Sequence, residues 1–274
     1  MTVTGVRGAE GRLSVRVGEP LARHTPLRTG GPCGAWVVAH DFAGLAEVIS
    51  DCRAADWKLH LVGACSRVVF RDGPIDGAVV RLGTGFCALD EDWTVGAAFP
   101  MPALVGAATR AGRTGLEPFV CVPGTVGGSV LNDDGWDGLV ESVTVVRRGK
   151  PVEVELDEAR AKRPFVTSVR LRLAEGDVAQ IERKVRDGWA KQRPVPCGSW
   201  YEGPKRAPVR PALRSARLTM VRLRHVAIPP AAPELLVNLG EGTAADLQLL
   251  HRSALDRVNA VQGDDFGSRI KWLG

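Results

Sequence analysis

The sequence predicts an α+β protein with more than one domain, and three features of the chain support this. Of its 274 residues, 45% are hydrophobic, which is enough for a substantial core, and the length favours two domains. Short apolar runs alternate with segments of helical periodicity. A stretch at 193–211 is rich in proline, glycine and arginine, and we place a domain boundary shortly before it, at about residue 187.

The amino-terminal third predicts a small β-α-β-β unit. Asp41 follows an apolar run and precedes apolar residues at helical spacing, so it is a candidate N-cap. The turn Arg71-Asp72-Gly73 is flanked by two further apolar runs, which are predicted strands. In chain order the predicted elements are a strand at 35–39, a helix over 45–52, and strands at 58–62, 68–70 and 78–82.

The rest of the chain predicts a second set of strands and helices. Pro102 stands where the first turn of a helix is expected, and Thr243-Ala-Ala-Asp246 resembles a capping box that begins another helix. The pair Trp200-Tyr201 indicates that part of the 193–211 stretch packs against other residues. The remaining predictions are a strand from 93, a glycine-rich segment at 115–138, strands at 142–146, 152–156, 166–173, 218–226 and 235–239, and a helix over 177–191.

Composition and charge argue against several classes of protein. The formal net charge is +5, but Arg and Lys are spread over the whole chain and only 5% of residues are aromatic, so we expect no nucleic-acid partner. A mild attraction for phosphorylated small molecules is the simpler interpretation. The six cysteines lack metal-ligand spacing, so neither a metal site nor a disulfide framework is expected. Without a signal-like amino terminus or an apolar stretch near the roughly 18 residues of a membrane span, we expect a cytoplasmic protein with no membrane partner.

Two glycine segments about sixty residues apart are suited to bringing main chain close to a ligand. The loop Gly63-Ala64-Cys65-Ser66-Arg67 lies between predicted strands, where successive N–H groups can form an anion-binding nest for a pyrophosphate. In Val122-Pro123-Gly124-Thr125-Val126-Gly127-Gly128-Ser129-Val130, three glycines accompany a proline that restricts φ. For each segment the alternative is an ordinary tight turn.

With these segments the chain resembles the UDP-N-acetylenolpyruvoylglucosamine reductase family, flavoenzymes of peptidoglycan precursor synthesis. The run Pro123-Gly-Thr-Val-Gly-Gly128 is the most specific match, and the order of motifs is preserved from about residue 20 to the end. The other matching motifs are Thr25-Pro-Leu-Arg-Thr-Gly-Gly-Pro32, Lys191-Gln-Arg-Pro194, Gly198-Ser199 and Val237-Asn238-Leu-Gly240, with Thr243-Ala-Ala-Asp246 after them.

The resemblance implies an FAD-binding fold of the vanillyl-alcohol oxidase (PCMH) type in two subdomains, with a smaller α+β substrate domain. The implied boundaries are 1–82 and 83–186 for the FAD-binding subdomains and 187–265 for the substrate domain, with 266–274 returning to the first subdomain. An FAD-dependent oxidoreductase acting on a small molecule is implied, with NADPH as a possible reductant of the flavin.

The resemblance also implies roles for individual residues. Ser199 matches the serine that protonates the substrate after hydride transfer from the flavin, and Arg163 is the candidate for the arginine that supports the enolate. Trp200, Tyr201 and Asn132 are the expected substrate-binding residues. The residues expected to bind FAD are Val62, Gly63, Ala64, Cys65, Ser66, Arg67, Pro123, Gly124, Thr125, Gly127, Gly128 and Ser129.

Departures from the family pattern fall on the substrate side. Arg269 occupies the place of a catalytic glutamate near the carboxyl end, and Arg67 stands where the family has asparagine. A Ser-x-x-His-Ala-Asn segment is replaced by 229–234, and a Gly-Leu-Lys-Gly segment by 216–219. We therefore expect a diverged flavoenzyme in a specialised biosynthetic pathway, acting on a small anionic molecule by C=C reduction or by a non-redox cyclisation or isomerisation. The alternatives are the NADPH-dependent cell-wall reductase itself and a non-catalytic binding protein on an FAD scaffold.

Overall fold

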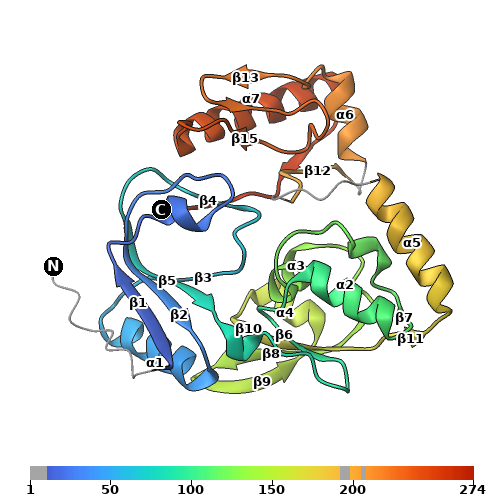
Figure 1. Ribbon diagram of the computed structural model, residues 1–274. Helices are drawn as coiled ribbons and strands as arrows, with labels where there is room; N and C mark the ends of the chain where they lie inside the picture. Colours follow the sequence, from blue (N-terminus) through green and yellow to red (C-terminus); the bar gives the residue numbers. More distant parts are fainter. Residues whose placement is uncertain (1–10, 192–197, 205–207) are drawn as a thin grey trace. The chain divides into compact units, whose positions relative to one another are not determined.

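The computed structural model describes residues 11–191, 198–204 and 208–274, and it confirms the α+β prediction (Figure 1). Residues 192–194 of the predicted Lys191–Pro194 motif lie outside the described residues. The chain forms two compact units and passes between them several times. Among described residues, unit 1 comprises 11–17, 34–64 and 77–191, and unit 2 comprises 18–33, 65–76, 198–204 and 208–274. The domain boundaries expected after 82, 186 and 265 stay predictions.

The first sheet of unit 1 has the strand order β1-β2-β5-β3. Strand β1 is antiparallel to β2, and β3 is parallel to β5. The Asp41 carboxylate accepts a hydrogen bond from the Gly44 N–H (2.7 Å), which confirms the predicted N-cap of α1. The elements are β1 (Leu13–Val17), β2 (Cys33–Ala39), α1 (Phe42–Ala54), β3 (Leu59–Val62), β5 (Ile75–Leu82) and the 3-10 turn η2 (Thr84–Phe86).

The second sheet of unit 1 is antiparallel, with the order β6-β10-β8-β9. Helix α3 packs against β6 and β10, and α4 packs against β8. The buried side chains of Val143 and Val169 belong to the same apolar core as Val37 and Val80 of the first sheet. The elements are β6 (Thr94–Gly96), α2 (Met101–Arg110), β7 (Arg113–Thr114), η3 (Glu117–Phe119), α3 (Val126–Asn132), β8 (Val140–Arg147), β9 (Lys150–Val154), α4 (Leu156–Lys162), β10 (Val166–Leu171), β11 (Ala174–Glu175) and α5 (Val178–Lys191).

Unit 2 combines a long helix with small sheets. Figure 1 shows α7 lying along β13 and β15, with α6 beside them. These two strands pair in antiparallel fashion with β14, which also packs against α7. Strand β12 pairs with β16 in antiparallel fashion, and β17 pairs with β4 in parallel. The elements are the 3-10 turn η1 (Leu21–His24), β4 (Val68–Phe70), β12 (Tyr201–Glu202), α6 (Val209–Ser215), β13 (Arg222–Leu223), β14 (Val226–Ala227), β15 (Val237–Asn238), α7 (Ala244–Gln262), β16 (Gly267–Ser268) and β17 (Lys271–Leu273).

The amino terminus of α7 is held by two sets of side-chain hydrogen bonds. The Thr243 hydroxyl accepts from the Asp246 N–H (3.0 Å) and the Asp246 carboxylate accepts from the Thr243 N–H (3.3 Å), which confirms the predicted capping box. The Asp72 carboxylate accepts from the N–H groups of Ala244 (2.7 Å) and Ala245 (3.1 Å). The Arg71-Asp72-Gly73 turn therefore anchors a helix that begins more than 170 residues later. In the described part of the chain, no helix is both long and apolar enough to cross a bilayer.

Three predicted elements differ from the structure. The single strand expected at 218–226 is wrong, because the left-handed backbone of Arg224 (φ 51°) turns the chain into the β13–β14 hairpin. Strand β9 ends at Val154, where Glu155 and the helix α4 replace the expected continuation to 156. The glycine-rich segment at 115–138 contains the unpredicted helix α3, because tertiary packing stabilises a short helix that the intrinsic propensity of glycine disfavours.

Left-handed backbone also occurs at Arg217 (φ 54°) and Met220 (φ 61°), positions at which glycine is usual.

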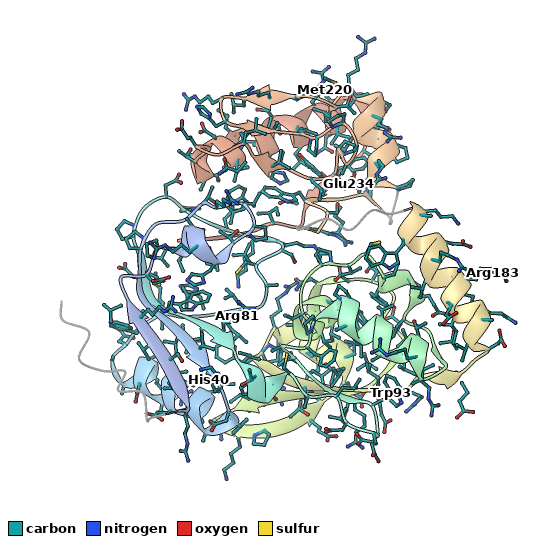
Figure 2. The ribbon with its side chains drawn as sticks, viewed as in Figure 1. His40, Arg81, Trp93, Arg183, Met220 and Glu234 are labelled. Carbon is teal, nitrogen blue, oxygen red and sulfur yellow. The ribbon has the colours of Figure 1, made fainter. Side chains whose placement is uncertain are left out.

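Met220→Gly is expected to raise the free energy of unfolding by about 1 kcal/mol, because glycine adopts this φ without the clash that Cβ causes. The Met220 side chain, labelled in Figure 2, is 76% exposed, so its removal sacrifices little packing. Urea titration measures the change. Met220→Ala keeps the Cβ and is the matched control; equal effects of the two substitutions would contradict the backbone explanation.

Candidate functional site

The start of the first glycine segment lies against the second glycine segment in unit 1. A Cβ added to Gly63 would stand 2.7 Å from Oγ1 of Thr125, so the main chain of the first segment passes directly beside the second. Val62 at the end of β3 and Gly63 thus reach the start of α3, although about sixty residues separate them in the chain. The structure therefore shows a contact between two segments that no local sequence pattern could place side by side.

The two consecutive glycines of α3 serve different purposes. A Cβ on Gly127 would lie 2.8 Å from Cβ of Ala97, and the Gly127 N–H donates to the Ala97 carbonyl (3.0 Å). Close packing inside unit 1 therefore requires this glycine, independently of any ligand. Gly128 is exposed, and a Cβ there would meet only Oγ1 of Thr125 at 3.5 Å. It is Gly128 that leaves main chain open to an approaching molecule.

Other predicted residues of this segment are part of its internal support. The Ser129 hydroxyl is buried and accepts a hydrogen bond from the Trp136 indole N–H (3.2 Å). The Gly124 carbonyl, next to Pro123, accepts from the Met101 N–H (3.1 Å) at the start of α2. These bonds hold the segment rigid, so the exposed surface around Gly128 is preorganised.

Arg163 and Asn132 form a short hydrogen-bonded chain at the other end of α3. Arg163 donates to Oδ1 of Asn132 (2.8 Å), and Nδ2 of Asn132 donates to the Gly128 carbonyl (2.7 Å). Arg163 has left-handed backbone (φ 44°) and ends α4, which directs its side chain to α3. The predicted catalytic arginine and the predicted substrate-binding asparagine are thus neighbours of the exposed glycine.

Sequence reasoning missed Arg160, which supports the same helix. Its guanidinium donates to the carbonyls of Val130 (3.1 Å) and Asp133 (2.8 Å) and pairs with Asp137 (3.1 Å). These acceptors include the unpaired carbonyls expected at a helix end. The only sequence signal was an arginine three residues before Arg163, which is an ordinary pattern.

In unit 2 the loop that contains Cys65, Ser66 and Arg67 lies beside the chain around Ser199. The Gly198 N–H donates to the Ser66 carbonyl (3.1 Å), and the Lys271 N–H donates to the Arg67 carbonyl (3.0 Å). Cys65 is buried with left-handed backbone (φ 55°), a conformation that costs energy in a residue other than glycine. The loop therefore turns sharply after Ala64 and joins the Ser199 segment through main-chain bonds.

Ser199 and Arg269 are brought together by the short β12–β16 pair. The Arg269 N–H donates to the Trp200 carbonyl (3.0 Å), while the Ser199 hydroxyl donates to the Tyr201 carbonyl (2.9 Å). The Arg269 guanidinium lies 3.5 Å from the Glu202 carboxylate and its side chain is 22% exposed. Sequence reasoning missed Glu202, because only the strand register shows that it faces the Arg269 strand. A hydroxyl donor and a cation at one strand end can protonate a substrate and stabilise negative charge.

Trp200 and Tyr201 are core residues in this structure. Their relative exposures are 0% and 1%, and both rings contact His251 of α7, with centroid distances of 5.8 and 4.8 Å. Burial raises the pKa of the Tyr201 hydroxyl above its ordinary range, so it stays protonated. The main-chain N–H of Trp200 donates to the carbonyl of Glu234, labelled in Figure 2, and the Glu234 carboxylate binds Arg210 of α6. Their expected role as walls of a substrate pocket stays a prediction.

Comparison with known proteins gives relatives that match nearly the whole chain. A UDP-N-acetylenolpyruvoylglucosamine reductase of Gluconobacter oxydans is 27% identical over 292 residues, covering 98% of this chain and 94% of that protein. A reductase of the same name from Caulobacter vibrioides is 29% identical over 306 residues, covering 97% and 96%. No family model matches the chain.

A solved structure shares the fold over the same extent. The crystal structure of UDP-N-acetylenolpyruvylglucosamine reductase from Thermus caldophilus matches with a TM-score of 0.79 and 24% identity, covering 96% of this chain and 99% of that chain. The FAD-binding fold expected from the sequence is confirmed by this match. In the described ranges no group of His, Cys, Asp and Glu side chains is arranged to hold a metal ion.

Proposed function

Because the chain belongs to the UDP-N-acetylenolpyruvoylglucosamine reductase family and is an FAD-dependent oxidoreductase of that type, we propose that it acts on a small anionic molecule other than the nucleotide sugar. The observation that carries the proposal is Arg269. A partly exposed guanidinium stands beside the Ser199 segment. From the resemblance to the family, a carboxylate is expected at this position. The change reverses the charge available to a substrate there.

The residues of the glycine segments fit FAD. Gly63 lies against Thr125, and Gly128 offers main chain that a Cβ would cover, so a flat or phosphate-bearing group can come close without meeting side chains. In unit 2, the sharp turn at Cys65 presents the main chain of Ser66 and Arg67. We propose that these residues contact FAD, with the expected contacts from Val62 to Arg67 and from Pro123 to Ser129.

When bound, FAD supplies hydride transfer, with NADPH as the proposed reductant. Ser199 is the proposed proton donor, and its hydroxyl must turn from the Tyr201 carbonyl, to which it now donates, toward the substrate. Arg269 is the proposed partner of the negatively charged group of the substrate. Its electrostatic attraction to the substrate increases when hydride transfer produces an enolate. Glu202, 3.5 Å away, restrains the guanidinium without burying it. Arg163 is the proposed second cation, oriented by Asn132.

A half-reaction assay with the nucleotide sugar tests the proposal. The purified protein is reduced with NADPH under anaerobic conditions, and UDP-N-acetylglucosamine enolpyruvate is then added while the flavin absorbance between about 350 and 500 nm is followed. We expect NADPH to bleach the flavin and the sugar to leave it bleached, because a cation replaces the carboxylate of the family site.

The Gluconobacter oxydans reductase is the control, and its flavin should be reoxidised in the same assay. Rapid reoxidation of the present protein would contradict the proposal and identify it as a cell-wall reductase. A flavin that NADPH does not bleach would instead favour the non-redox cyclisation or isomerisation, and a colourless protein that takes up no FAD would favour the binding protein.

A further inference from the structure

The β12–β16 pair, which positions Ser199 and Arg269, is too short to be stable without other contacts. Each strand has two residues, with Tyr201 opposite Ser268 and Glu202 opposite Gly267. One further bond, from the Arg269 N–H to the Trp200 carbonyl, extends the ladder. Isolated two-stranded ladders are marginal in water even when they are longer. The positions of Ser199 and Arg269 therefore depend on contacts from outside the ladder.

His251 provides those contacts from the buried face of α7. Its Nε2 lies 2.8 Å from Oγ of Ser268, the middle of the three residues 267–269. The same Oγ accepts a hydrogen bond from the Ile270 N–H (3.2 Å), so the Ser268 hydroxyl is held on both sides. The imidazole is 4% exposed and sits on a regular helix of 19 residues, which makes it a rigid support.

The imidazole ring also packs against both flanking strands. It contacts Tyr201 and Trp200 of the Ser199 segment and Trp272 of β17 (6.3 Å between centroids). Trp272 belongs to the strand that pairs with β4, directly after the loop of Ser66 and Arg67. The His251 side chain thus contacts the segment that follows Ser199, the strand β16 that precedes Arg269, and the strand β17 that follows it. Burial lowers the pKa of His251 to about 4, so the ring is neutral at neutral pH and introduces no buried charge.

We propose that His251 is a positioning residue that fixes the β12–β16 pair through Ser268 and thereby sets the orientation of Ser199 and Arg269. Their chemical importance rests on the proposed function, whereas the positioning itself concerns geometry alone. Among the described contacts, His251 makes no side-chain hydrogen bond to Ser199 or to Arg269. Its effect on them therefore passes through the main chain of the two strands.

Amide hydrogen exchange of the flavin-loaded protein tests this. His251→Phe keeps an aromatic ring in the cluster but removes the bond to Ser268, and we expect exchange of the Arg269 and Glu202 amides to become at least tenfold faster. His251→Gln can again offer a nitrogen or oxygen to Ser268 and should restore most of the protection. His225→Phe, at a half-exposed histidine of the β13–β14 turn, is the matched control.

The pattern of exchange separates positioning from general stability. Faster exchange confined to 199–202 and 267–270 supports the proposal. Equal acceleration throughout α7 and the β4–β17 pair would mean that His251 only stabilises unit 2, and unchanged exchange would mean that the ladder holds itself; either result overturns it. If exchange is local but the half-reaction assay with NADPH and the nucleotide sugar contradicts the proposed function, the positioning stands and only the proposed function fails.

Discussion

Gly128→Val is expected to weaken FAD binding by at least a hundredfold, which corresponds to about 2.7 kcal/mol. The folded chain accepts a Cβ at this position, because the nearest atom, Oγ1 of Thr125, is 3.5 Å away. The added methyl groups then cover the main chain that FAD is proposed to approach. Titration of the apoprotein with FAD, followed by quenching of flavin fluorescence, measures the dissociation constant.

Two other glycines make this experiment specific. Gly106→Val introduces the same side chain in the middle of α2, where a Cβ would meet only the flexible end of Arg110 at 3.4 Å, and FAD binding should be unaffected. Gly127→Val collides with Ala97 and should destabilise the fold itself, so its loss of FAD would not locate the cofactor. An unchanged dissociation constant for Gly128→Val would show that FAD does not approach α3 here.

Trp200→Ala is expected to lower the free energy of unfolding by about 3–5 kcal/mol, the usual cost of deleting a large buried ring. Trp200 is fully buried and its ring contacts His251 and Trp272, whereas its bond to the Glu234 carbonyl is made by the main-chain N–H and survives the substitution. Urea titration followed by circular dichroism measures the loss. Trp189→Ala is the matched control, because that ring is 47% exposed and its deletion should cost far less.

The same substitution distinguishes two interpretations of the Trp200-Tyr201 pair. If the rings were walls of an open pocket, Trp200→Ala would mainly change ligand binding and leave stability near that of the control. A large loss of stability in Trp200→Ala, together with a smaller loss in Trp200→Phe, would show that the pair supports the Ser199 segment from the core. We expect the second result, since Tyr201 is buried beside Trp200 and shares its contact with His251.

The structure also explains motifs whose purpose was not evident from residue types. Asn238 of the Val237–Gly240 motif donates to the carbonyls of Leu27 (2.9 Å) and Gly242 (2.8 Å), and it accepts from the N–H groups of Gly240 and Gly242. Asp72 anchors α7. Both motifs therefore stabilise the fold of unit 2, and their presence is evidence for the fold and not for the reaction.

The sequence by itself determined the fold class and the family, because both depend on local patterns. Asp41 and the Thr243–Asp246 box could be predicted as caps, since a cap bonds within one helical turn. The order of short motifs likewise identified the family without any knowledge of contacts. That Arg269 stands in place of a carboxylate is an expectation from the same motif order and stays a prediction.

Only the tertiary structure decided which residues face a ligand and which support the core. The contact of Gly63 with Thr125, the packing of Gly127 on Ala97 and the partnership of His251 with Ser268 join residues far apart in the chain or on different elements. Residue type could not separate Gly127 from Gly128, because their difference arises from the neighbour that each meets. Long-range packing sets these distances, and no local pattern records them.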